Sequence, residues 1–158
     1  DEINPLLSPP SGDNKGVARD KPTATRRHTM NSLTILNTLR NHQLWIDGDP
    51  SGVRANFTDA DLRGTDLSYE NLADAILTGA DLTGADLFRV DLSCAHLYGA
   101  NLTGADLTGA DLTYAILTKA DLTDADLTEA YLCDAILTDA DLTGADLTNT
   151  DMFGTKRD

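Results

Sequence analysis

One apolar residue recurs at every fifth position from Phe57 to Met152, and this period constrains the fold more than any other feature of the chain. The twenty central positions hold eighteen leucines, and the residue two before the central position is alanine in sixteen repeats. The residue just before it is usually Asp or Asn, and the residue just after it is usually Thr. The unit is therefore Ala-Asp-Leu-Thr-Xaa, repeated without a break over residues 55–154.

A five-residue period matches neither the turn of a helix, about 3.6 residues, nor the strict alternation of a strand. It directs one side chain inward per repeat only if the backbone turns a corner in each repeat. We therefore expect short straight segments wound into a coil, with successive coils stacked about 4.8 Å apart so that their backbone groups pair. Leucine-rich repeats need units of about 20–29 residues and coiled coils need heptads, so the period excludes both.

Tandem Ala-Asp/Asn-Leu-Xaa-Xaa units resemble those of the pentapeptide repeat proteins, and the resemblance covers residues 55–154. It implies an all-β solenoid, a right-handed quadrilateral β-helix of about five coils with four repeats in each coil. It implies no single activity, because the family shares a shape and not a function. In such a coil the central Leu and the Ala two before it point inward, and residues twenty apart lie one above another.

Glu70 occupies one of the inward alanine positions, where the coils above carry Val90, Ala110 and Ala130. A lone buried carboxylate costs several kcal/mol. We therefore expect either a distorted corner at Glu70 or contact of its carboxylate with backbone amides, water or Arg54.

Residues 1–29 contain four of the five prolines and no hydrophobic stretch, so we interpret them as an extended tail. The tail carries a basic cluster that comprises Lys15, Arg19, Lys21, Arg26 and Arg27. The repeats hold nineteen acidic residues against three basic ones, so the net charge of −14 originates in the repeats. We expect weak contact between the tail and the acidic sides, lost as salt rises past about 0.15 M.

Residues 30–54 combine a helical pattern with a lead-in to the first repeat. Ile35, Leu39, His42 and Ile46 fall on one stripe of a helix. A stack of coils leaves unpaired backbone and exposed leucines at its ends, which must be covered. We therefore expect an N-terminal capping α-helix on the first coil, with Trp45 as its largest contact, and a short tail at residues 155–158.

The residues just before the central leucines form four columns when four repeats make a coil. The first column is apolar and gives a candidate interaction face of Ile76, His96, Ile116 and Ile136. The third is an unbroken acidic column of Asp66, Asp86, Asp106, Asp126 and Asp146. Asp in a column either fits the turn by bonding nearby amides or imitates a charged rod. The isoleucines either mark a contact surface or improve the stacking of the sheet.

The reactive residues are not spaced for catalysis or metal binding. The three histidines, His28, His42 and His96, have no acid or nucleophile partner assured by spacing. Cys94 and Cys133 lie nearly two coils apart, too far for a disulfide, and two thiols without further ligands make no zinc site. The Asp columns lack the glycine-rich nonapeptide of calcium-binding β-rolls. We therefore expect no enzyme activity, no cofactor and no metal.

The expected function is a non-catalytic scaffold or protein-interaction module with an unidentified protein partner. The alternative implied by the resemblance is an acidic DNA mimic that binds a DNA topoisomerase such as gyrase. Relatives of that kind favour Phe at many central positions, where this chain has Leu. Ice binding is a third hypothesis, but a single Thr column such as that from Thr83 to Thr143 lacks a paired neighbour.

Three further expectations concern assembly and location. An end-to-end homodimer would cover the last coil through Met152 and Phe153. The acidic repeats are not expected to bind nucleic acid directly, and no apolar run approaches the length of a membrane span. The default location is the cytoplasm, or the periplasm or thylakoid lumen if the absence of an initial Met reflects removal of a signal peptide.

Overall fold

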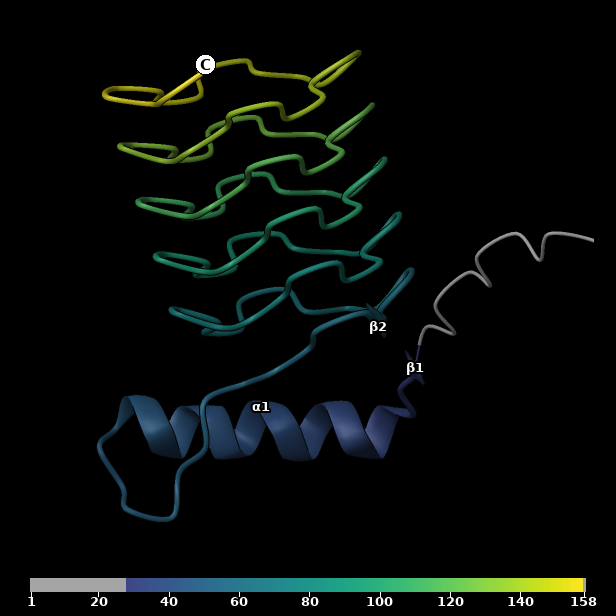
Figure 1. Ribbon diagram of the computed structural model, residues 1–158, viewed down its shortest axis with the longest axis vertical. Coiled ribbons are helices and arrows are strands. Elements are labelled where there is room, and N and C mark those ends of the chain that lie inside the picture. Colours follow the sequence, from purple (N-terminus) through teal and green to yellow (C-terminus); the bar gives the residue numbers. More distant parts are fainter. Residues whose placement is uncertain (1–27, 158) are drawn as a thin grey trace, which may run out of the picture.

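The computed structural model describes residues 28–157, which form a helix at the base of a stack of coils (Figure 1). The chain passes through strand β1 (His28–Thr29) and helix α1 (Ser32–Ile46) into the first coil, which contains strand β2 (Ala60–Asp61). From there it winds upward, and residues twenty apart pair in parallel bridges, as Asn101 does with Asp121. Each coil has one bridge position in each of four pentapeptides, and we number these sides one to four from the side that contains Asn56.

Backbone hydrogen bonds hold each coil to its neighbours. In the repeat that begins at Ala100, the amides of the central Leu and of the fifth residue donate to the coil above at 2.7 and 2.9 Å, and the amide of Asn101 donates to the coil below at 2.9 Å. The amide of Ala100 closes a turn with Leu97 O at 3.0 Å, and the amide of Thr103 donates to Asn101 Oδ1 at 3.0 Å. Four of the five amides in the repeat therefore donate to backbone carbonyls. The remaining amide, which follows the central Leu, needs an acceptor on the side chain that precedes the Leu.

The coil turns its corner at the fifth residue of every repeat, where φ is positive, between 52° and 74°. This left-handed conformation disfavours residues that carry a Cβ. Glycine nevertheless holds only eight of the twenty positions, and Asp or Asn hold six more. The corners are therefore imposed by stacking as well as by local preference.

Replacing Gly104 with Ala should lower the free energy of unfolding by about 1 kcal/mol, because the left-handed conformation costs a residue with a Cβ about 1–2 kcal/mol. Gly104 has φ +62° and an added Cβ would meet nothing within 4 Å, so the change isolates backbone conformation from packing. The reverse change, Tyr114→Gly, should be neutral or stabilising, since the flexibility of unfolded glycine offsets part of the gain. Urea titrations followed by circular dichroism measure both changes. An unchanged midpoint for Gly104→Ala would contradict the corner strain.

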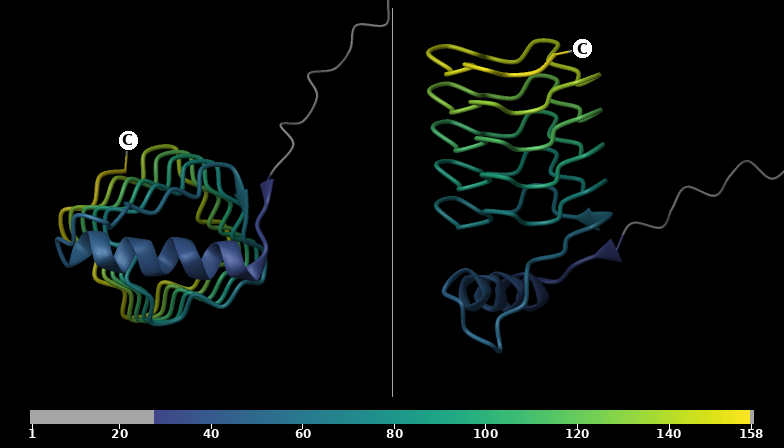
Figure 2. Two further views of the ribbon diagram at one scale, coloured as in Figure 1. Left: turned by 90° about the horizontal axis from the view of Figure 1, so that it is seen from below. Right: turned by 60° about the vertical axis from the view of Figure 1, so that its left-hand side comes forward.

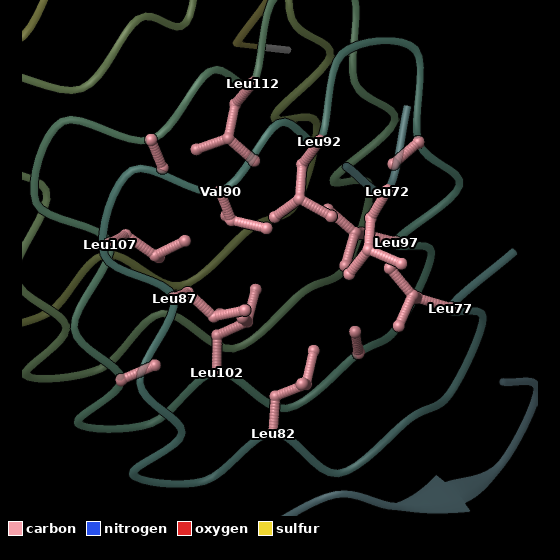
Figure 3. Close-up of a cluster of buried hydrophobic side chains, with 14 of the residues drawn as sticks. Leu72, Leu77, Leu82, Leu87, Val90, Leu92, Leu97, Leu102, Leu107 and Leu112 are labelled. Atoms are coloured by element: carbon pink, nitrogen blue, oxygen red, sulfur yellow. The ribbon is translucent and has the colours of Figure 1, made fainter. Parts of the chain in front are cut away.

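Leucine and alanine fill the interior of the stack. The central leucines from Leu62 to Leu132 expose at most 1% of their surface. Figure 3 shows those of successive coils, with Val90 among them, projecting into one shared interior. At about 2 kcal/mol for each buried Leu, this layered core is the main source of stability.

Helix α1 lies across the lower end of the stack (Figure 2). Asn31 caps its N-terminus by accepting a hydrogen bond from the Thr34 amide at 2.9 Å. The helix buries Ile35, Leu39 and His42 against the first coil. The predicted amphipathic helix is therefore present, and it covers the first coil as expected.

Strand β1 extends the lower edge of the first coil. It runs parallel to β2, with His28 opposite Ala60 and Thr29 opposite Asp61. The last two residues that the sequence assigns to the tail therefore join the coil. The basic cluster from Lys15 to Arg27, and its predicted contact with the acidic sides, lie outside the described residues.

Glu70 is half-buried and its corner keeps regular hydrogen bonds, with its amide 3.2 Å from Leu67 O and its carbonyl 3.0 Å from the Asp91 amide. The expected distortion is absent. The side chain lines a cleft of about 430 Å³ between α1 and the first coil, together with Ile35 and Leu39. Glu70 therefore keeps access to solvent, because α1 leaves this part of the first coil uncovered.

The other end of the stack differs from the lower end. Pairing continues to Lys156, which bridges to Ile136, two residues past the predicted end of the repeats. Leu142, Leu147 and Met152 are only half-buried, because no further coil lies above them within residues 28–157.

Candidate interaction face

The column of Ile76, His96, Ile116 and Ile136, called here the Ile column, forms a continuous ladder on side one. Each member bridges in parallel to the next, and the ladder continues to Asn56 below and Lys156 above. All four side chains are half-buried, although each Ile was expected to expose a large apolar surface. Stacking accounts for the difference, since each member bridges to residues directly above and below it in the ladder. The ladder is therefore a narrow strip.

Two exposed aromatic side chains flank this strip. Tyr98, two residues after His96, is 46% exposed, and Tyr114, two residues before Ile116, is 58% exposed. The Lys119 ammonium lies 6.0 Å from the centre of the Tyr98 ring, at the outer limit of a cation–π contact. Side one therefore combines apolar, aromatic and basic groups.

The carboxylates and amides of the other columns hold the backbone. Every repeat with Asp or Asn before its central residue has a hydrogen bond from the backbone amide two residues on to the side-chain Oδ1, at 2.9 to 3.4 Å. For Asp66, the Ser68 hydroxyl and amide both donate to the carboxylate and lower its pKa. Thr143 and Thr148 lower the pKa of Asp141 and Asp146 in the same way. The turn interpretation of the columns therefore has direct support.

The Ile column lacks this bond because its side chains offer no such acceptor. Within residues 28–157, no protein group accepts a hydrogen bond from the amides of Thr78, Tyr98, Thr118 and Thr138, which follow the four members of the column. The amide of Cys133, which follows Tyr131 on side four, is in the same position. Side one therefore carries a row of four donors without protein acceptors. These amides can be located from the sequence, since each lies two residues after an Ile, His or Tyr that replaces Asp or Asn. The replacement becomes meaningful only when the hydrogen bond from this amide to the Asp or Asn Oδ1 is known.

The acidic column of side three is the most exposed of the four. All five residues, Asp66, Asp86, Asp106, Asp126 and Asp146, are exposed. On side two, Arg63 approaches Asp61 at 2.7 Å and Asp81 at 3.8 Å. Near side three, the Arg89 guanidinium lies 5.4 Å from the centre of the Phe88 ring. Side three therefore presents an unbroken column of carboxylates to solvent.

The two predicted end contacts occupy opposite ends of the stack. Trp45 is 37% exposed and stacks on the His42 ring, with ring centres 5.5 Å apart. Met152 is half-buried and Phe153 is 79% exposed at the last coil. The end-to-end homodimer stays a prediction, since a single chain does not test it.

The thiols and histidines form no reactive cluster in the part of the chain that the structure describes. Cys94 and Cys133 are both unpaired, and desolvation raises the pKa of each thiol. His42 is packed inside the cap, and His96 stands alone in the Ile column. No group of three or more His, Cys, Asp or Glu side chains in residues 28–157 is placed to hold a metal ion. Across the same residues, no helix has the length and apolar character needed to cross a membrane.

Comparison with known proteins places the chain among proteins with the same repeat. The sequence profile described as pentapeptide repeats matches eight copies, over residues 55–93, 91–128 and 115–154. These segments span residues 55–154, more than half of the chain. The search of curated proteins gives no match.

Several solved structures are similar. A pentapeptide repeat protein from the thylakoid lumen of Arabidopsis thaliana is 31% identical, with 63% of this chain and 66% of that chain covered and a TM-score of 0.50. The pentapeptide repeat protein Rfr23 from the cyanobacterium Cyanothece 51142 is 30% identical over 78% of this chain and 95% of its own, with a TM-score of 0.45. QnrB1, a plasmid-mediated fluoroquinolone resistance protein, is 20% identical over 67% of this chain and 64% of its own, with a TM-score of 0.25. Neither the profile nor these structures indicate an enzyme family, and the chain belongs to the pentapeptide repeat family.

Proposed function

We propose that the chain folds as a right-handed quadrilateral β-helix and serves as a non-catalytic scaffold that binds a protein partner through side one. The Ile column is the observation that carries this proposal. Asp and Asn fill the other three columns except at Tyr131, and they satisfy one amide in each repeat. Side one gives up that bond in four consecutive coils, from Ile76 to Ile136. The repeated loss of this bond in one column supports a contact at side one, in addition to the stacking that half-buries the isoleucines.

The surroundings of the Ile column support the same proposal. Aromatic side chains with one polar end are enriched at protein interfaces. Tyr98 and Tyr114 expose about half of their surface beside the column. The bridge residues of side one between Ile76 and Ile136 include no carboxylate, so apolar side chains of a partner can pack on them without desolvating a charge.

The double change Ile116→Asp with Ile136→Asp should abolish partner binding and leave the stack folded. Neither side chain points into the core, and each new carboxylate can accept the amide two residues on, as Asp121 does for Thr123 at 3.0 Å. The measurement is affinity capture from an extract of the source organism, followed by titration of the captured partner in purified form. The partner's retention should fall at least about tenfold, as for loss of contacts at the centre of an interface.

The matched control changes the acidic column of side three, with Asp106→Asn and Asp126→Asn. Both substitutions keep the side-chain acceptor and remove only charge. If this control loses the partner and the isoleucine double variant keeps it, the partner binds through the acidic sides and not through side one. That outcome would favour the gyrase-binding alternative, which a DNA supercoiling assay with the unmodified protein tests directly.

A further inference from the structure

We propose that side one docks an extended segment of a partner protein whose backbone carbonyls accept hydrogen bonds from the free amides and whose side chains alternate between apolar and basic. This inference rests on the proposed function and specifies the chemistry of the partner. The free amides follow the members of the Ile column and belong to Thr78, Tyr98, Thr118 and Thr138.

The free amides determine what the partner must offer. In the other columns an Asp or Asn oxygen occupies the acceptor position, at 3.0 Å from the amide in the case of Thr103. On side one, Ile or His replaces the Asp or Asn and provides no oxygen at this position, so an acceptor has to come from outside the coil. A burial of this row by a partner without acceptors would leave the donors unsatisfied, which is unfavourable. Backbone carbonyls of an extended segment supply such acceptors, as in other modes of peptide recognition by exposed backbone. Carbonyls on one edge of the segment recur about every 6.8 Å and the amides about every 4.8 Å, so one segment pairs with about half of the four amides in any one register.

The size of the strip favours a segment over a globular surface. Six coil levels, from Asn56 to Lys156, carry members of this ladder. At a spacing of about 4.8 Å they span about 24 Å, which an extended chain covers with about seven residues. The strip is one side chain wide, and stable contacts between folded proteins need about 800 Å² on each partner. A second copy of this chain laid flat on the strip would meet too little apolar surface.

The charges around the strip favour basic side chains. Four carboxylates lie at the corners that border side one, Asp59, Asp74, Asp134 and Asp139, and they outnumber the two cations at these edges, Arg54 and Lys119. Asp columns on sides two and four lie beyond these corners. Apolar side chains of the partner can lie on the Ile column while longer Lys or Arg side chains reach the flanking carboxylates. An acidic segment would be repelled at both edges.

Amide chemical shifts of the full chain provide the test. We would titrate the ¹⁵N-labelled protein with three eight-residue peptides with blocked ends, which alternate Val with Lys, Val with Gln, or Val with Glu. The Val-Lys peptide should give saturable shifts at Thr78, Tyr98, Thr118 and Thr138, with a Kd about tenfold or more below that of the Val-Glu peptide. The amides of Thr83, Thr103, Thr123 and Thr143 on side two, which already donate to Asp or Asn, are internal controls and should not move.

Two variants at one position isolate the role of the free amide. Ile116→Asn supplies an acceptor to the Thr118 amide, so the Thr118 shift should disappear and the affinity for Val-Lys should fall severalfold. Ile116→Val keeps the amide free and should keep the binding. Protection of the coil-to-coil amides from hydrogen exchange verifies that both variants are folded.

Several results would overturn the inference: no shifts with any peptide, equal binding of Val-Glu and Val-Lys, shifts confined to the Asp columns, or unchanged binding by Ile116→Asn. The proposed function fails separately, when the Ile116→Asp and Ile136→Asp double variant keeps its natural partner. If the double variant loses its natural partner but no peptide binds, side one is still an interface, and the partner is not an extended basic segment.

Discussion

Replacing Leu102 with Ala should lower the free energy of unfolding by about 3 kcal/mol, within the range of about 2–5 kcal/mol measured for buried leucines elsewhere. Leu102 is in the middle coil and exposes none of its surface. Coils lie directly above and below it, so the walls of the new cavity are held by backbone bonds and cannot collapse inward. Urea denaturation followed by circular dichroism measures the change.

Leu142 provides a matched control for this prediction, because it lies two coils above Leu102 in the same column. Leu142 is half-buried and packs against the core from one side. Leu142→Ala should therefore cost about half as much or less, since it removes less buried surface and leaves an open notch. Equal losses at the two positions would contradict the layered core, in which Leu142 is less buried than Leu102.

The fold was largely predictable because the repeat leaves little freedom. The five-residue period requires a corner in each repeat. Leu and Ala are the apolar residues that recur in the repeat, so they must face the interior. The columns drawn from a spacing of twenty residues coincide with the bridges, from Asn56–Ile76 through Ile136–Lys156. Helix α1 was also predictable, since the stripe of Ile35, Leu39 and His42 becomes its buried face.

The departures arise where one coil meets something other than another coil. Glu70 occupies an alanine position, but the first coil borders α1 and an open cleft, so its carboxylate is not buried. The pairing of β1 with β2 has no periodic signal, because two residues cannot express one. The burial of the Ile column also escaped prediction, since it depends on contacts along the stack axis between residues twenty apart.

The sequence predicted which residues form the candidate face, but it did not predict the unpaired backbone amides that they leave. Ile76, Ile116 and Ile136 stand out in the sequence because they replace Asp or Asn. Their larger consequence is the free amide two residues later, and it becomes visible only with the hydrogen bonds of the neighbouring columns in hand. The substitution pattern therefore identifies a candidate face, and the hydrogen bonds of the neighbouring columns show which of its amides lack a protein acceptor.

Lowering the pH below about 6.5 should loosen the cap, because His42 must stay neutral in the folded protein. His42 is fully buried, and its Nδ1 accepts a hydrogen bond from the Ala55 amide, at the first residue of the coils, at 3.1 Å. Burial is the main cause that lowers the pKa of His42 below 6.5 and nearby Arg54 lowers it further, while the backbone of Ala73 and the carboxylate of Asp74 oppose this effect. The unfolded state therefore binds a proton before the folded state does. The stability from His42 is complete above pH 6.5 and is lost as the pH falls through the folded pKa.

Trp45 makes this loss measurable, since it is the only tryptophan of the chain and stacks on His42 with an angle of 12° between the rings. Its fluorescence and the urea midpoint should both change with pH below 6.5 in the unmodified protein. His42→Gln keeps a neutral acceptor and should remove this pH dependence. His42→Ala leaves the Ala55 amide unpaired and should cost about 1–3 kcal/mol at pH 8.

Asp66, Asp141 and Asp146 do not interfere with this experiment, because the pKa of each is lowered. The pKa values of Asp66, Asp141 and Asp146 are lowered below 3.8 by hydrogen bonds from Ser68, Thr143 and Thr148, so their contribution to stability is lost only at pH values below about 4. A change between pH 6.5 and 5 that persists in His42→Gln would therefore have another origin. In that case the buried imidazole would not control the attachment of α1 to the first coil.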